Sequence, residues 1–341
     1  MAAMPKSFIE TILSCCETAK PNFFYNTLMD SLHTPAVRDL AWVIGSPNLL
    51  DENHAAYAGR VVEGAWCDAQ SIKCAPKLMA LDRNPSSLHD FIAARPTRRL
   101  GHYFETLIAY WLAHILELEI IATNLQVRNT DRTVGEYDFL LRDENSAVCH
   151  WEAAVKFYLQ AEPIAEQHAF IGPGGRDRLD IKLNRVFTHQ LNLGTTPEGR
   201  ATLPSGLTLN KAQAFIAQAF IKGMLFFPLS QTEKFSDARP SVAGISNKHL
   251  SGWWVRHPIE KLLYTTTDKH WVIQPRLHCL APARLTNNVG IMRHDELSAA
   301  LDQHFYASRD AVHVAELRQD TEGEWREVSR GFVVCNTWPV I

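Results

Sequence analysis

Residues 134–159 read VGEYDFLLRDENSAVCHWEAAVKFYL, and this stretch decides the fold that we predict. Successive side chains of a β-strand point to opposite faces, so residues of equal parity share a face. From 147 to 159 every odd-numbered residue is apolar, whereas the even-numbered residues include Glu152 and Lys156. The residues from 134 to 142 also alternate. The pattern predicts two consecutive strands, each with one apolar face and with ionisable groups on the other.

The segments on both sides of this hairpin predict a mixed α/β fold. Residues 98–115 place their apolar side chains on one helical face, and residues 177–191 predict a second helix. Further strands are predicted at 118–127 and 221–227. The resulting order of helix, three strands, helix and strand indicates an α/β fold (α+β, with a mixed sheet) and not a doubly wound parallel sheet.

The chain divides into three predicted regions. Residues 1–95 read as a helical N-terminal region, with helical spacing at Phe8–Leu13 and Val37–Ile44. Residues 96–230 contain the αβββαβ core, and residues 231–341 form a strand-rich C-terminal region packed on it. Three tryptophans of this last region suit core packing or, less commonly, stacking on single-stranded nucleic acid: Trp253, Trp254 and Trp271.

Composition restricts the class of protein. Of the 341 residues 46% are hydrophobic and 21% are charged, which is typical of a packed globule and excludes a disordered chain. The net charge of −3 excludes a globally basic nucleic-acid coat protein. Seven cysteines without a CxxC pair disfavour a disulfide framework and a zinc ribbon. No apolar run is long enough for a signal sequence or a membrane span, so we expect a cytoplasmic protein without a membrane partner.

The even-numbered face of the later hairpin strand, residues 147–159, is a candidate site. A solvent-facing strand would scatter polar residues over this face, but Glu152 and Lys156 flank Ala154 among other small or apolar residues. Charges on a half-buried face must be paired or bind an ion, because desolvation is otherwise too costly. Asp138, on the earlier strand of the hairpin, adds a carboxylate, and Mg²⁺ commonly takes one or two carboxylates. We therefore expect Asp138 and Glu152 to bind Mg²⁺ or Mn²⁺ and Lys156 to stabilise charge, as in metal-assisted phosphodiester hydrolysis.

The length of the connection predicts the register of the hairpin. Opposed residues of an antiparallel pair share a face, and a slip of one residue moves every side chain across the sheet. Pairing Asp138 with Glu152 sets Arg142 opposite Val148 and leaves 143–147 as a loop of ordinary length. A register shifted by two residues would also keep one acidic face. In either register we expect Asp138 and Glu152 to project from one side of the sheet, together with Lys156.

These motifs carry two resemblances. The order of elements, with Asp138 on the second strand and Glu152 and Lys156 on the third, resembles the PD-(D/E)XK nuclease superfamily over about residues 98–230. That resemblance implies a restriction-endonuclease-like core, a divalent metal and a nucleic-acid substrate. Most of the chain resembles an uncharacterised bacterial family, the domain of unknown function numbered 1853. The segments that carry this second resemblance are Gly135–Phe139, His150–Tyr158, Asp177–Leu183, Val37–Trp42, Gly252–Trp254 and Arg330–Val334.

The sequence departs from the superfamily pattern at its third motif. That motif is an acid, any residue and Lys, but here Ala154 stands two residues before Lys156, and Glu152 lies about 7 Å further back along the strand. Glu136, which the predicted register sets opposite Ala154, is therefore a further candidate metal ligand. The resemblance also implies that Glu105 on the first helix joins the site. Without the resemblance, Glu105 fits equally well as a boundary residue that pairs with a basic neighbour on that helix.

A basic stripe on the second helix is a candidate nucleic-acid-binding surface. Three cations share one side of this helix, where they can bind a phosphate backbone, although most such stripes are solvated helix faces: Arg178, Lys182 and Arg185. Gln190 resembles a glutamine that some superfamily members carry on the same helix. The glycine-rich turn at 172–175 lacks the GK[ST] ending of a phosphate-binding loop, and no GxGxxG follows a strand, so we expect no nucleotide cofactor.

These observations lead to one principal hypothesis and two alternatives. We expect a Mg²⁺-dependent nuclease that hydrolyses phosphodiester bonds in DNA or RNA. The first alternative is a protein that keeps the nuclease fold and binds nucleic acid without catalysis, because Ala154 has removed metal binding. The second is a structural or interaction protein that acts through its Trp-rich C-terminal region. Binding of Mg²⁺ or Mn²⁺ separates the first two, and salt-dependent affinity for nucleic acid separates the last two.

Overall fold

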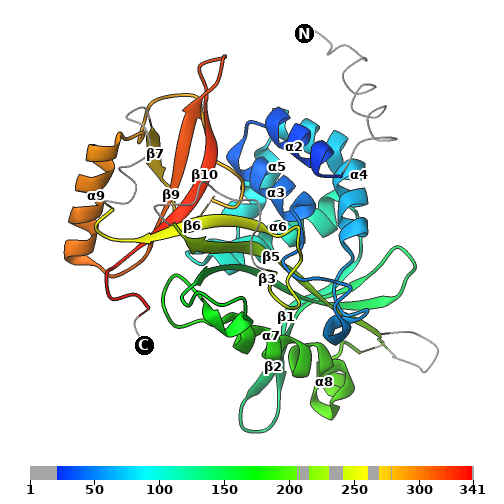
Figure 1. Cartoon of the computed structure of the whole chain (residues 1–341). Coiled ribbons are helices and arrows are strands. Elements are labelled where there is room, and N and C mark those ends of the chain that lie inside the picture. Colours follow the sequence, from blue (N-terminus) through cyan, green and yellow to red (C-terminus); the bar gives the residue numbers. More distant parts are fainter. Residues whose placement is uncertain are drawn as a thin grey trace.

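The computed structural model describes residues 21–205, 207, 215–229, 241–259, 269–277 and 279–339 (Figure 1). The helix predicted at Phe8–Leu13 lies outside these residues. The described part of the N-terminal region is helical, with α2 (Pro21–Ser31), α3 (Pro35–Gly45), α4 (Gly64–Arg83) and α5 (Ser86–Ala93). Helix α3 confirms the predicted helix at Val37–Ile44, and Pro35 in its first turn supplies a backbone angle suited to a helix start.

The predicted order of helix, three strands, helix and strand is present. It consists of α6 (Leu100–Tyr110) with a π-helical turn η2 (Trp111–Ile115), β1 (Ile120–Arg128), β2 (Thr133–Arg142), β3 (Val148–Gln160), α7 (Leu179–Thr188) and β5 (Phe215–Pro228). Strand β1 pairs antiparallel with β2, β2 pairs antiparallel with β3, and β3 runs parallel to β5. Shorter elements lie between them, namely β4 (Phe170–Ile171), the 3₁₀ helix η4 (Gln190–Thr195) and α8 (Pro197–Thr202).

The C-terminal strands extend this same sheet. They are β6 (Leu250–Arg256), β7 (His270–Ile273), β8 (Arg284–Leu285), β9 (Val312–Gln319) and β10 (Trp325–Val334), with α9 (His294–Ala307) between β8 and β9. Across the described residues the sheet has ten strands in the order β1-β2-β3-β5-β6-β10-β9-β7, with β4 and β8 paired beside this path. Strand β6 pairs in parallel with both β5 and β10, so the predicted core and the C-terminal region share one hydrogen-bonded sheet.

Helices cover both faces of the sheet around β3 and β5 (Figure 1). On one face, which we call the α6 face, residues of α3, α4 and α6 share a hydrophobic core with Trp151 and Val155 of β3. On the opposite face, called the α7 face, residues of α7 pack with Ala154 and Tyr158. Both faces of β3 are therefore buried, and the removal of apolar surface from water on each side stabilises the layered arrangement.

The C-terminal tryptophans belong to the packed interior. Trp253, Trp254 and Trp271 are exposed by 2%, 4% and 1%, which confirms core packing as their role and leaves no ring face for stacking on nucleic acid. Trp253 and Trp271 meet edge to face at 5.8 Å between ring centres. Among the residues that the structure describes, no helix combines the length and the apolar character that crossing a membrane requires.

Candidate functional site

The hairpin of β2 and β3 has the predicted register as far as Asp138. Arg142 pairs with Val148, and the pairing continues without a shift as far as Phe139 and Trp151. The next pair would join Asp138 to Glu152, but there the Asp138 carboxylate accepts the hydrogen bond of the Ala153 backbone N–H at 2.9 Å. A side chain takes the place of a strand partner, so the two strands separate at this residue.

Side-chain alternation in β2 changes at the same residue. Phe139 packs in the core of the α6 face, whereas Tyr137 packs with Leu193 of η4 on the α7 face. In a regular strand these two residues would point to the same side, so the side-chain alternation breaks at Asp138, although the register between β1 and β2 does not shift there. Glu136, next to Tyr137, therefore lies on the α6 face, away from Leu140, and the prediction that the even-numbered residues of this strand share one face is wrong for Glu136.

Asn124 of β1 lies at the matching position. Its neighbours on both sides pair with β2, but Asn124 and Asp138 do not pair with each other. Asn124 has a left-handed backbone with φ of 51°, a conformation that a non-glycine residue adopts only where its surroundings impose it. Its amide nitrogen donates to Glu105 Oε2 and to Glu136 Oε1, each at 3.2 Å. Asn124 thus joins two of the predicted acids.

Glu152 is buried and has a hydrogen-bond donor at each oxygen. Its side chain is 3% exposed, and Lys182 Nζ of α7 lies 2.9 Å from Oε1. Gln190 Nε2 of η4 donates to Oε2 at 3.2 Å. Both partners come from the α7 face, so Glu152 points to that side of the sheet.

Close packing of η4 on β2 places Gln190 beside Glu152. A Cβ atom at Gly135 would lie 2.8 Å from Leu193 and 3.0 Å from Gln190 Oε1. A larger residue at this position would displace the ends of the Leu193 and Gln190 side chains, and so disturb the contact of Gln190 with Glu152. Gly135 of the sequence motif therefore leaves the space in which Gln190 reaches Glu152.

Asp138 has the strongest electrostatic perturbation of the site. Burial raises the pKa of Asp138 well above its usual range, and the neighbouring carboxylates of Glu152 and Glu105 add to the effect. The hydrogen bond from Ala153 and the charge of Lys182 lower the pKa only in part. Ionisation of Asp138 is therefore costly where this group lies, and a divalent cation would offset that cost.

Glu105 lies at the edge of this group. Its side chain is 20% exposed, and His102 Nδ1 of the same helix lies 3.2 Å from its Oε2. Glu105 thus pairs with a basic neighbour on α6, as the alternative expected, and also contacts Asn124. Glu136 is half-buried and reaches the group through the same asparagine.

Lys156 is not in contact with Glu152. Its Nζ lies 2.5 Å from Asp177 Oδ2, and its side chain is 27% exposed. The cation that contacts Glu152 is Lys182, which the sequence analysis assigned to the nucleic-acid-binding stripe. The spacing of Glu152 and Lys156 along the strand separates them, whereas α7 crosses the strand directly over Glu152.

The basic stripe on α7 is partly neutralised. Arg178 forms an ion pair with Asp180 at 2.7 Å, and Lys182 pairs with Glu152. Arg185 is exposed, and no ion pair joins it to any residue in the described part of the chain. The three predicted cations therefore differ in their availability to a phosphate backbone.

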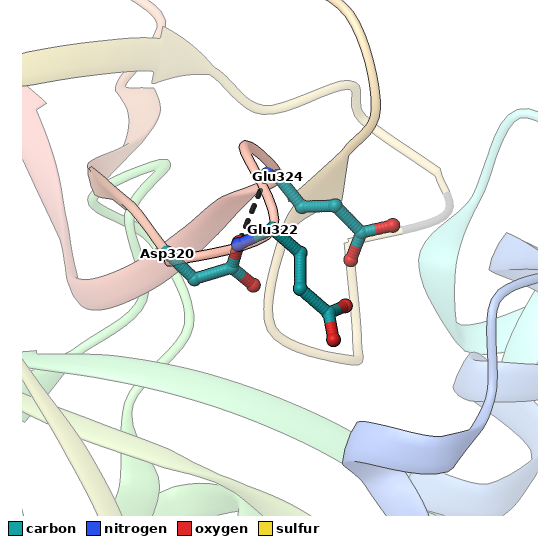
Figure 2. A group of neighbouring side chains, drawn as sticks. All are labelled: Asp320, Glu322 and Glu324. Atoms are coloured by element: carbon teal, nitrogen blue, oxygen red, sulfur yellow. Dashed lines mark hydrogen bonds between the residues drawn. The ribbon is translucent and has the colours of Figure 1, made fainter.

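A second acidic group lies in the turn between β9 and β10 (Figure 2). Among the described residues, only Asp320, Glu322 and Glu324 bring three possible ligand atoms within 4.8 Å of one another. The Asp320 carboxylate accepts the backbone N–H groups of Glu322 and Glu324, and Arg326 and Arg284 pair with Asp320 and Glu324 at 2.6 Å each. The turn is thus stabilised by its own hydrogen bonds and arginines, and it serves as a comparison for the group around Asp138.

Comparison with known proteins places the chain in one family. The model of the domain of unknown function (DUF1853) matches residues 38–334, from α3 to the end of β10. The chain belongs to this family. No curated protein and no solved structure matches the chain. The matched range contains every residue of the carboxylate group, and the comparisons lend no support to the resemblance to the PD-(D/E)XK superfamily.

Three residues of the site could not be assigned from spacing alone. The sequence pattern does not predict a role for Asn124, because a single asparagine in a strand does not change its periodicity. Asparagine does tolerate the left-handed conformation better than most residues. The sequence predicts Lys182 as part of the basic stripe, but its contact with Glu152 depends on how α7 crosses β3. Gln190 was noted only through the resemblance, and it too contacts Glu152.

Proposed function

We propose that the protein is a metal-dependent phosphodiesterase that acts on DNA or RNA, with Asp138 and Glu152 binding Mg²⁺ or Mn²⁺. The observation that carries this proposal is the separation of β2 and β3 at Asp138, where a half-buried carboxyl group lies within electrostatic range of Glu152 and Glu105. The order α6, β1, β2, β3, α7 and β5 is the order of elements that the resemblance to the PD-(D/E)XK superfamily implies.

The donor set fits a hard divalent cation. Mg²⁺ binds carboxylate oxygens, retains several waters and commonly needs only one or two carboxylates from the protein. Asp138 and Glu152 supply these carboxylates, and the surplus of acidic groups favours a cation between them. Glu105 and Glu136, which are both partly exposed, have room to rotate towards an ion as further ligands.

Each residue would contribute a defined role to hydrolysis. A bound ion would neutralise phosphate charge and activate water for attack on the phosphorus. Asp138 and Glu152 would hold the ion where the strands separate, and Asn124 would orient Glu105 and Glu136 towards it. Lys182, beside Glu152, would stabilise negative charge on the phosphate, a role that the sequence analysis gave to Lys156.

A second candidate function is nucleic-acid binding without catalysis. It is favoured by the hydrogen bonds of Glu152, since Lys182 and Gln190 already meet both of its oxygens. In that case the carboxylate would stabilise the packing of α7 and η4 on β3, and no metal would bind.

Thermal unfolding in the presence of metal separates the two functions. A ligand at ten times its Kd stabilises the folded state by about 1.4 kcal/mol, which would raise the melting temperature of this chain by about 2 °C or more. We expect Mg²⁺ and Mn²⁺ to produce this rise in the wild type and not in Asp138→Asn. The variant keeps an oxygen that can accept the Ala153 N–H, so its fold should persist.

The acidic turn provides the matched control. Glu322 is exposed in that turn, and Glu322→Gln removes one carboxylate from the group without disturbing β2 or β3. Stabilisation that survives in Asp138→Asn but disappears in Glu322→Gln would place the metal at the turn and refute the proposal. Cleavage of labelled single- and double-stranded DNA and RNA, with and without EDTA, then tests the activity, and metal binding without cleavage of any of them would favour the second function.

A further inference from the structure

A cavity of about 630 Å³ lies apart from the carboxylate group, between the start of α6 and the C-terminal strands. Its wall joins Arg98 and Leu100 to Phe157 of β3 and, across the sheet, to His313 of β9 and Phe332 of β10. The volume is within the range of about 300–1,000 Å³ that is usual for small-molecule sites. The cavity exists only because β9 and β10 continue the sheet that contains β3.

The wall of the cavity carries three arginines without partners. Arg98, Arg99 and Arg276 are exposed, and none of their side chains forms an ion pair or hydrogen bond with any residue that the structure describes. Asp310 is the acid among the lining residues. Three arginines against one aspartate make this wall positively charged, so it favours an anionic ligand.

The start of α6 borders the same cavity through Arg98, Arg99 and Leu100. Tyr103 N–H makes the first hydrogen bond of this helix, to the carbonyl of Arg99, and no side chain caps the helix. The backbone N–H groups of Leu100, Gly101 and His102 therefore lack partners within the helix, and a Cβ atom on Gly101 would meet open space. Free amides at a helix start bind phosphate groups, because the N–H donors and the helix dipole act together.

The floor of the cavity is aromatic and contains one polar group without a partner. His313 is 8% exposed and stacks on Phe332 at 4.7 Å between ring centres, and none of the residues that the structure describes forms a hydrogen bond with its Nε2. Burial and the charge of Arg330 hold the pKa of His313 well below its usual range, so the ring is neutral and carries one donor and one acceptor. A hydrocarbon ligand would leave this imidazole unsatisfied, whereas the edge of a heteroaromatic ring can bond with it.

We propose that the cavity binds a nucleoside phosphate, with the phosphate at Arg98, Arg99 and the first turn of α6, and the base against Phe157 and His313. The ligand is either a free mononucleotide or the terminal nucleotide of a nucleic-acid strand. Glu105 lies five residues after Leu100 on α6, about 8 Å along the helix axis. The cavity and the carboxylate group thus both lie along α6. Binding itself requires no metal chemistry and stands independently of the proposed phosphodiesterase activity.

Binding measurements in EDTA test this proposal, since metal-dependent cleavage cannot contribute there. The probes are adenosine 5′-monophosphate, a 5′-phosphorylated single-stranded oligonucleotide, adenosine and inorganic phosphate, each titrated by calorimetry against the full-length protein. We expect one or both of the first two to bind, and the double variant Arg98→Gln/Arg99→Gln to weaken their Kd at least tenfold. The double variant Arg132→Gln/Arg318→Gln, with the same change in charge on exposed residues outside the cavity, should bind as the wild type does.

The pattern of binding identifies the source of the ligand or refutes the proposal. Binding of the mononucleotide alone indicates a free metabolite, and binding of the oligonucleotide with or without the mononucleotide indicates a strand end. Adenosine binding as tightly as its phosphate would overturn the phosphate site, and inorganic phosphate binding as tightly would overturn the base site. If neither nucleotide probe binds, or if both pairs of substitutions have equal effects, the cavity does not have this function.

Discussion

The ion pair of Glu152 and Lys182 gives a prediction whose size follows from the structure. Glu152 is 2% exposed, and its Oε1 lies 2.9 Å from Lys182 Nζ. At that distance and an effective dielectric constant of about 20, the Coulomb attraction amounts to about 6 kcal/mol, most of which offsets the desolvation of the two charges. The net effect of each substitution therefore depends on which charge remains buried.

The two single substitutions should have unequal effects. Lys182→Met leaves a buried carboxylate without its cation and beside Asp138, so we expect a loss of about 3–5 kcal/mol in the free energy of unfolding. Glu152→Gln leaves Lys182, which is 21% exposed and can turn to water, so we expect a loss of only about 1–2 kcal/mol. The double variant buries neither charge, and it should be more stable than Lys182→Met alone.

A double-mutant cycle measured by urea unfolding at pH 7 tests this reasoning. We expect the two single losses to exceed the loss of the double variant by at least about 2 kcal/mol. Arg185→Met, on the same helix but without an ion pair among the described residues, is the control and should unfold at the wild-type midpoint. Single effects that add up within about 0.5 kcal/mol would mean that the two groups do not interact, and the geometry of the site would be refuted.

Two further predictions concern buried charges that hold the C-terminal region against the helices. Burial raises the pKa of Asp39 to about 6, so its ionisation destabilises the folded state progressively as the pH rises from about 4 to 6. Asp39→Asn should therefore gain stability relative to the wild type by up to about 3 kcal/mol between pH 4 and pH 7, and a constant difference in urea unfolding across this range would contradict the assignment. Arg330 is 4% exposed, pairs with Glu327 and donates to the carbonyls of Cys279, Leu280 and Ala281, so Arg330→Met should cost about 3–5 kcal/mol in thermal unfolding. The exposed Arg318→Met should leave the melting temperature unchanged, and equal losses in the two variants would show that burial of Arg330 has no special effect.

Much of the central region could be predicted because its signals are local. Alternation over 147–159 predicted β3, and the short connection at 143–147 predicted the pairing of Arg142 with Val148. Both follow from the two-residue period of a strand and from the few geometries that a short hairpin loop allows. The order of helices and strands from α6 to β5 followed from the change between helical and strand periodicities.

The continuation of the sheet could not be predicted in the same way. Strand β6 pairs with β5 over a gap in sequence that contains residues 230–240, and β10 then pairs with β6 across α9 and β9. Pairing between distant segments leaves no local pattern, because the periodicity of a sequence identifies a strand but not its neighbours in the sheet. The C-terminal strands were therefore expected to pack on the core when they in fact extend its sheet.

The sequence by itself determined which residues would be acidic, basic and buried in this protein, because composition and periodicity are properties of the chain. Only the tertiary structure decided which of them meet. Strand alternation fails at Asp138 because its carboxylate takes a backbone N–H that a strand would otherwise bond, and Asn124 must adopt a left-handed backbone opposite it. Lys182 and not Lys156 contacts Glu152, because a helix that crosses a strand brings distant residues together, whereas residues four apart on a strand lie about 13 Å apart.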